Sequence, residues 1–412
     1  MHNIHINLIS EQIIPNLIPT LSDPDCIGVI LIFGDDTMDE KANRLEQIYS
    51  ERGIPILWSC HGNSSHNLPK LKEQAVSLIT YLKDNFSDKR WVLNATCGTK
   101  PMSLAMTMAF YQHNSHLPEN METALILYTD SQNKSIPLLN DNVDYQLPYR
   151  SVLSLEELLA ANGFMMMSAT DKHNDQIVLD RAELTEFLGH KFSSNCRRMF
   201  SALHGMATGA AKDFPINKRQ TMSSIPHGAY AEVYLRLNDE GLLIWNGESN
   251  EIEFCSENAC RYLAGLWLEE LTYLQALKCG FEEVAMSVEG LWGDKYDREN
   301  AQIRGDVPKG NNNEFDVLIR HKNQLLTIEC KARYWDGKSH DSSESTHQDV
   351  MHKLDNLGNK LGGLFARNLL VSAFSISEAM KKRASDNRIK VCDDISVGKI
   401  KRQFDFLFKE MD

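Results

Sequence analysis

Residues 91–102 read W-V-L-N-A-T-C-G-T-K-P-M, and this stretch decides the fold of the N-terminal third of the chain. Its apolar start predicts a buried strand over residues 91–96. A turn of small and polar residues follows, and then an apolar pattern with helical spacing after Pro101. A strand, a short turn and a helix start with free backbone N–H groups are how α/β domains hold phosphate or a nucleotide. The stretch has neither G-x-G-x-x-G nor the Walker pattern G-x-x-x-x-G-K-[ST], so it does not indicate NAD binding or ATP hydrolysis.

Four further apolar, β-branched runs occur in the first 145 residues. Between them, residues 38–49 and 71–82 carry the apolar spacing of helices. Strands that alternate with helices form a parallel sheet covered on both faces. We therefore predict an α/β, doubly wound, Rossmann-like domain with strands at residues 4–9, 28–33, 54–59, 91–96 and 124–129.

Polar residues follow several of these predicted strands. Ligands of parallel sheets bind beyond the carboxyl ends of the strands, so these residues predict a ligand crevice. The alternative is an ordinary turn in which Thr99 caps the next helix and Pro101 takes its first turn. The polar residues are Ser10, Glu11, Gln12, Gly34, Asp35, Asp36, Thr96, Thr99, Lys100, Thr129 and Asp130.

The C-terminal region contains two strand patterns, at residues 314–320 and 324–330, joined by a tight polar turn that predicts a hairpin. Side chains two apart on a strand share a face, so Glu329 and Lys331 point the same way, and Asp316 lies opposite them. Converging carboxylates can hold Mg²⁺ or Mn²⁺, and an ammonium beside them can act on a phosphodiester. The alternative is an exposed strand face whose charges pair across the hairpin.

A helix predicted over residues 258–277 precedes the hairpin and offers a third carboxylate. Glu270 falls inside the apolar stripe of this helix and Glu269 lies at its edge. The spacing alone therefore selects neither glutamate.

The region between the two sites has a mixed pattern. We expect helices at residues 153–159, 181–188 and 194–207, and a linker at 209–227. Strands expected at 231–237 and 241–245 would complete a small helix-plus-hairpin module. The predicted domains are residues 1–148, 149–254 and 255–412.

Two sets of motifs resemble a known family. The run N-A-T-C-G-T-K-P-M at 94–102, with N-L-I-S-E-Q at 7–12, resembles the CARF domain of CRISPR-associated proteins, a Rossmann-like sensor of cyclic oligoadenylates. G-L-W-L-E at 265–269, N-E-F-D at 313–316 and I-E-C-K at 328–331 are similar to the PD-(D/E)xK restriction-endonuclease-like domain. Type III CRISPR ancillary nucleases join these two domains. One departure is Cys97, where a glycine or another small residue is expected.

The resemblance implies a homodimer that binds one cyclic oligoadenylate, expected to be cyclic tetra-adenylate, across its two-fold axis. Binding would activate metal-dependent cleavage of RNA, DNA or both. The resemblance favours Glu269 over Glu270 and implies that Glu269, Asp316 and Glu329 hold Mn²⁺ or Mg²⁺ and are catalytic together with Lys331. The implied ligand contacts are Ser10, Gln12, Thr96, Gly98, Thr99 and Lys100.

The composition of the whole chain limits the kinds of binding and the cellular location that we expect. The chain has 412 residues and a formal net charge of −13, which argues against coating nucleic acid by bulk electrostatics. The nine cysteines are scattered and never form C-x-x-C, so neither a disulfide framework nor a zinc knuckle is indicated. The longest apolar run, residues 26–33, is too short to span a bilayer. We therefore expect a cytoplasmic protein with no membrane partner.

Two other functions fit parts of the pattern. A constitutive restriction or repair DNA endonuclease would have the same C-terminal site and an N-terminal domain that merely packs. A non-catalytic regulator would bind a nucleotide messenger in the N-terminal domain and DNA through the middle module.

Overall fold

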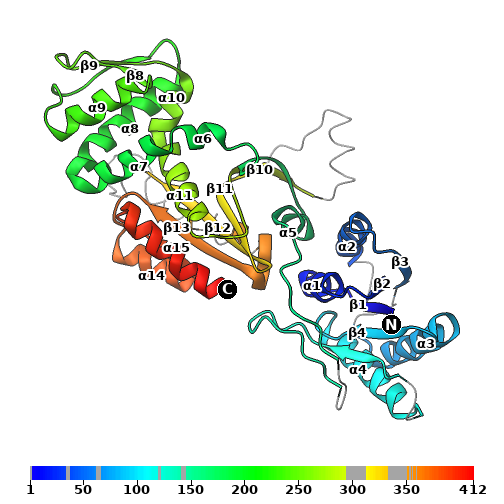
Figure 1. Ribbon diagram of the computed structural model, residues 1–412. Helices are drawn as coiled ribbons and strands as arrows, with labels where there is room; N and C mark the ends of the chain where they lie inside the picture. The colour runs from blue at the N-terminus through cyan, green and yellow to red at the C-terminus, as the bar shows by residue number, and fades with distance from the viewer. Residues whose placement is uncertain are drawn as a thin grey trace. The chain divides into compact units, whose positions relative to one another are not determined.

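The computed structural model describes residues 2–33, 38–61, 66–118, 122–140, 145–293, 312–332, 350, 351, 354, 356–358 and 360–412. Gly34, Asp35 and Asp36, expected at the ligand crevice, lie outside these residues. The chain divides into two compact units (Figure 1). The first comprises Met1–Met165, Leu291–Asn311 and Gly363–Phe365, and the second comprises Met166–Gly290, Asn312–Gly362 and Ala366–Asp412.

The first unit is built on a five-stranded parallel sheet in the order β3-β2-β1-β4-β5. This order confirms the predicted doubly wound fold, because the chain moves outward from β1 in one direction and then from β4 in the other. The strands are β1 (Asn3–Leu8), β2 (Cys26–Phe33), β3 (Ile56–His61), β4 (Arg90–Asn94) and β5 (Leu125–Leu127).

Helices cover both faces of this sheet and enclose two apolar cores. Helices α1 (Ile14–Ser22), α2 (Asp39–Glu51) and α5 (Leu155–Ala161) pack on one face. Helices α3 (Leu68–Phe86) and α4 (Lys100–Ser115) pack on the other. Helix α1 was not predicted, because its prolines at 15 and 19 break the usual helical pattern.

The second unit contains a six-stranded sheet in the order β14-β13-β12-β11-β10-β6. Strands β11 and β12 form the predicted antiparallel hairpin, and β12, β13 and β14 run parallel. The strands are β6 (Phe164–Asp171), β10 (Glu283–Trp292), β11 (Asn312–His321), β12 (Gln324–Lys331), β13 (Ala366–Ser372) and β14 (Ile389–Cys392).

Helices and a small sheet complete this unit. The helices are α6 (Gln176–Asp180), α7 (Ala182–Lys191), α8 (Arg197–Lys212), α9 (Ala229–Asp239), α10 (Glu257–Arg261), α11 (Trp267–Leu277), α14 (Glu378–Asp386) and α15 (Val397–Met411). π-Helical turns at Phe192–Cys196 and Tyr262–Leu266 join α7 to α8 and α10 to α11. The small sheet has the order β7-β9-β8, formed by β7 (Arg219–Thr221), β8 (Leu243–Ile244) and β9 (Glu251–Phe254).

The middle of the chain corrects two predictions. Residues 231–237 are not a strand but part of α9, whose buried Val233, Tyr234 and Leu237 have helical spacing. The expected linker at 209–227 contains the end of α8 and the strand β7. Both errors have one cause. A short apolar run or a group of turn-forming residues does not specify helix, strand or loop, and tertiary packing then determines which of these forms.

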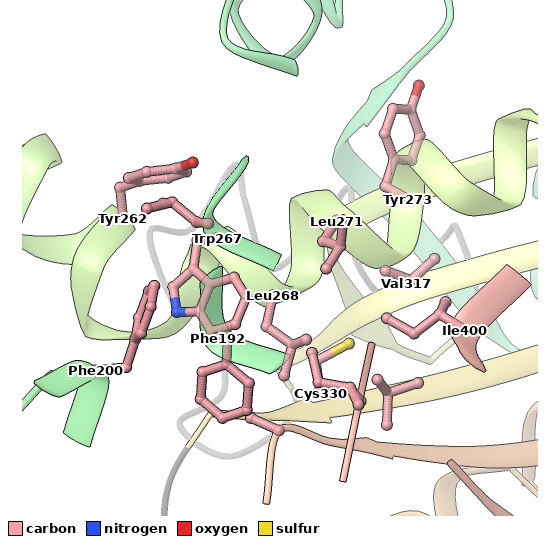
Figure 2. Packing of buried hydrophobic residues seen from close by; sticks show 14 of the residues in the cluster. Phe192, Phe200, Tyr262, Trp267, Leu268, Leu271, Tyr273, Val317, Cys330 and Ile400 are labelled. Carbon is pink, nitrogen blue, oxygen red and sulfur yellow. The ribbon is translucent and has the colours of Figure 1, made fainter. Parts of the chain in front are cut away.

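The middle region shares one apolar core with the C-terminal region. Trp267 at the start of α11 lies in this core, with its ring centroid 5.6 Å from that of Phe192 and 5.5 Å from that of Phe200 (Figure 2). The core therefore fixes the start of α11 against residues that lie much earlier in the chain. The division at residues 148 and 254 stays a prediction.

Candidate active site and ligand crevice

The hairpin brings together three of the predicted catalytic side chains. Val317 pairs with Ile328, and Lys322 and Asn323 form the tight turn with φ of 50° and 59°. This register places Asp316 beside the end of β12. The Lys331 ammonium lies 2.6 Å from Glu329 Oε1 and 3.5 Å from Asp316 Oδ2.

The two hairpin carboxylates are held in place and shielded from water. Asp316 and Glu329 are 9% and 5% exposed. The backbone N–H of Cys330 donates to Asp316 Oδ2 over 2.6 Å. The alternative was an exposed strand face whose charges pair across the hairpin. The observed carboxylates do not fit it, because both are buried and both contact the same lysine.

Helix α11 supplies the fourth member, Glu269. Burial, together with the charge of Asp316, raises the pKa of Glu269 to about 9. The charge of Lys331 acts in the opposite direction. Glu269 thus belongs electrostatically to the hairpin site.

Lys331 is the cation of the cluster. Burial disfavours its charged form, but Asp316 and Glu329 more than offset this and raise the pKa of Lys331 above its ordinary value. Its ammonium also donates to the backbone carbonyl of Cys330 over 3.0 Å. Lys331 is therefore a charged donor at neutral pH.

Residues that we predicted to line a ligand crevice follow β1 and β4, which are neighbouring strands of the first unit. The turns that follow these strands touch, since the Cys97 thiol donates to the Gln12 carbonyl over 3.1 Å. Gly98 has φ of 82°, and a Cβ there would lie 2.9 Å from the Leu8 Cβ. A side chain at position 98 would therefore push the turn after β4 away from the end of β1.

Of the predicted ligand residues, Thr96 and Thr99 already make hydrogen bonds within the protein, whereas Lys100 is exposed. The Thr96 hydroxyl donates to Asn94 Oδ1 and accepts from the Thr129 N–H, both over 2.6 Å. Thr99 caps α4 by accepting from the Met102 N–H over 3.4 Å, as the alternative interpretation expected. Lys100 is exposed at the start of the same helix.

The family comparison identifies both ends of the chain. Residues 4–158 match the Card1 CARF domain, and residues 256–409 match the Card1-like endonuclease domain. The chain belongs to the Card1-like CARF endonucleases. The predicted CARF domain and nuclease domain are thus confirmed. A comparison with curated protein sequences found no match.

Solved structures share the fold of this CARF endonuclease over its whole length. Protein VC1899 from Vibrio cholerae has a TM-score of 0.79 and 19% identity, and the match covers 99% of this chain and 98% of that one. Can2 from Sulfobacillus thermosulfidooxidans, in complex with cyclic tetra-adenylate, has a TM-score of 0.74 and 20% identity, with 100% and 97% covered. A type III CRISPR defence DNA nuclease activated by cyclic oligoadenylate has a TM-score of 0.52 and 16% identity, with 92% and 46% covered.

The donor set of the CARF endonuclease fits a hard divalent cation. Asp316 and Glu329 offer carboxylate oxygens, and the Cys330 carbonyl oxygen also lies within hydrogen-bond distance of the Lys331 ammonium. Carboxylate and carbonyl oxygens are the ligands that Mg²⁺ and Mn²⁺ prefer. No three of the described Asp, Glu, His and Cys side chains are already gathered at chelating distances. The Lys331 ammonium contacts two of the acidic side chains, Asp316 and Glu329.

Sequence reasoning missed the buried hydrogen bonds that join the ends of β1 and β4 to the start of α1. Asn94 Nδ2 donates to the Pro15 carbonyl over 2.8 Å and to Asn16 Oδ1 over 3.1 Å. Asn16 Nδ2 donates to the Leu8 carbonyl over 2.9 Å. The signal in the sequence was an asparagine at a fully buried strand position, Asn94, which requires a polar partner.

Proposed function

We propose that this CARF endonuclease cleaves phosphodiester bonds of RNA, DNA or both in a metal-dependent reaction. We further propose that cyclic oligoadenylate, in particular cyclic tetra-adenylate, activates it in CRISPR antiviral defence. The observation that carries the catalytic proposal is the contact of one ammonium, Lys331, with two buried carboxylates, Asp316 and Glu329. Residues 1–148 would form the sensor, 149–254 the connecting module and 255–412 the nuclease.

Each member of the site has a distinct role in this proposal. Asp316, Glu329 and Glu269 would hold Mn²⁺ or Mg²⁺, which when bound supplies Lewis-acid stabilisation of the phosphodiester oxygens. Lys331 donates hydrogen bonds to the attacking water and to the phosphoryl oxygen on which charge develops. The Cys330 N–H keeps Asp316 oriented while these groups act.

The crevice supports the activator proposal. Can2, which has the same fold, was solved in complex with cyclic tetra-adenylate. In this chain, Gln12 Oε1 is buried and has no hydrogen-bond partner among the described residues, so it can accept from a ligand amine. Ser10, Thr96, Gly98, Thr99 and Lys100 complete the proposed contacts, with Lys100 and the start of α4 facing phosphate.

A homodimer in the cytoplasm is part of the same proposal. Three large apolar side chains on α4 are exposed at spacings of four and three residues: Leu104 (54%), Met108 (51%) and Tyr111 (40%). Such a stripe is typical of a helix face that is covered by a partner. None of the described helices is long and apolar enough to cross a bilayer. All nine cysteines are free.

A cleavage assay tests the proposal. Labelled RNA and DNA are incubated with the full-length protein and Mn²⁺, with and without cyclic tetra-adenylate. We expect cleavage that requires both, and a loss of about 10²-fold or more in rate for Lys331→Ala or Glu329→Ala. Lys322→Ala, which changes a lysine in the turn of the same hairpin, is the matched control.

Three outcomes would contradict parts of the proposal. Full-rate cleavage without cyclic oligoadenylate favours a constitutive endonuclease. Cleavage that survives Lys331→Ala rejects the catalytic assignment. Nucleotide binding without any cleavage favours a non-catalytic regulator.

A further inference from the structure

Glu270, the neighbour of the proposed catalytic Glu269, is a fully buried carboxylate with a fixed partner. Its exposed fraction is 0%. Arg181 Nε donates to Glu270 Oε2 over 2.9 Å, and Arg181 Nη2 donates to Oε1. The Thr185 hydroxyl donates to Oε2 over 3.3 Å. Both carboxylate oxygens are thus engaged in a two-pronged ion pair.

The same pair also holds the segment that leads into α11. The Arg181 guanidinium lies over the Tyr262 ring, 4.5 Å from the centroid. The Tyr262 and Thr185 hydroxyls are 2.7 Å apart. Because Tyr262 begins the π-helical turn before α11, three segments of the second unit meet at Arg181.

Gly265 lies two residues before the start of α11. This residue has φ of 150°, inside the segment that joins α10 to α11. Among the described residues, a Cβ there would meet the Ala332 Cβ at 4.0 Å. Further along α11, the Tyr273 hydroxyl donates to Asp175 Oδ2 over 2.7 Å and anchors the same helix.

We infer that Arg181 and Glu270 are positioning residues, which fix the rotation of α11 so that Glu269 faces Asp316. The inference rests on the proposed catalytic role of Glu269. Adjacent residues on a helix point about 100° apart. A helix held by Glu270 on one side therefore directs Glu269 to a different side, and Glu270 is not a metal ligand.

Two variants test the pair in the full-length protein with Mn²⁺ and cyclic tetra-adenylate. Glu270→Gln keeps the shape but loses the two-pronged acceptor, and Arg181→Lys keeps the charge but loses the planar fork. We expect kcat to fall about 10- to 100-fold with KM for the nucleic acid unchanged, because a small misplacement of a catalytic group has this effect. Mn²⁺ should still bind. Glu257→Gln, which removes an exposed ion pair with Arg261 in the same segment, should leave kcat within about twofold.

The outcomes separate this inference from the proposed function. Wild-type kcat in either folded variant overturns the positioning role. Loss of Mn²⁺ binding in Glu270→Gln, as complete as in Asp316→Asn, would instead make Glu270 a ligand. If Glu270→Gln does not fold, Arg181→Lys decides, since it retains a cation opposite the carboxylate. Undiminished cleavage by Glu269→Gln rejects the catalytic assignment itself, whatever the other variants do.

Discussion

At the scale of single residues, the proposed catalytic site consists of four ionisable side chains. Asp316 and Glu329 are buried, and both are within 3.5 Å of the Lys331 ammonium. Glu269 has a raised pKa because burial and the nearby Asp316 disfavour its charge. In the absence of a divalent cation, Glu269 therefore retains its proton at neutral pH.

The raised pKa of Glu269 predicts a pH dependence of metal binding. With a pKa of about 9, Glu269 is protonated at pH 7 and must release that proton to bind a cation as a carboxylate. Affinity for Mn²⁺ should rise by about tenfold per pH unit below pH 9. Calorimetry in two buffers of different ionisation enthalpy should detect about one released proton at pH 7.

Glu269→Gln is the control for this titration, since its side chain has no proton to release. Wild-type binding without proton release would contradict the prediction.

At the scale of elements, β1 is unusual because both of its faces are buried and one is polar. Ile4, Ile6 and Leu8 enter one apolar core. Asn3, His5 and Asn7 are fully buried on the alternate positions. Asp23 Oδ2 lies 2.8 Å from both Asn3 Nδ2 and His5 Nε2. The central strand is thus held by hydrogen bonds on the face that α1 covers.

This network predicts a pH-dependent stability. Burial opposes ionisation of Asp23, but the hydrogen bond and charge of His5 outweigh it and lower the Asp23 pKa. A lowered pKa stabilises the fold above the unfolded value of about 4, and this contribution is lost as pH falls through the folded value. Asp23→Asn should lower the free energy of unfolding by about 1–3 kcal/mol at pH 7, and by less below about pH 4.

Urea denaturation at the two pH values measures the Asp23 effect. Asp25→Asn, at an exposed position two residues away, should change the unfolding free energy little at either pH. An equal loss for Asp23→Asn at both pH values would argue against the ionised network.

At the scale of the whole molecule, the exposed stripe on α4 leads to the prediction of a dimer. Leu104→Glu combined with Met108→Glu places charges in a contact that should be apolar. We expect this double variant to sediment as a monomer and to bind cyclic tetra-adenylate at least about tenfold more weakly. Ile216→Glu, at an isoleucine that is 85% exposed in the second unit, is the control. Dimer formation by the double variant would place the interface elsewhere.

Sequence reasoning located the strands of the first unit and the hairpin that carries Asp316, Glu329 and Lys331, and it did so for local reasons. The strands of the first unit follow from apolar runs of limited length, and the hairpin follows from its turn and its period of two. Sequence reasoning missed α1 and α9, whose patterns contain proline or a short apolar run. It also missed the strands β6 and β10 and, because only helices were expected after the hairpin, β13 and β14. Only burial against the rest of the chain resolves such cases.

By itself, the sequence determined that Asp316, Glu329 and Lys331 meet, because a tight turn sets the register between the two strands that carry them. All three residues belong to one hairpin, so no contact with a distant part of the chain is needed to bring them together. Only the tertiary structure decided which glutamate of α11 faces the hairpin, since Arg181, 89 positions from Glu270, sets the rotation of that helix. It likewise decided which atoms join the turns after β1 and β4, where the Cys97 thiol donates to the Gln12 carbonyl. The physical reason is the same in both cases: pairing over long chain distances depends on the packed core and leaves no periodic signal in the local sequence.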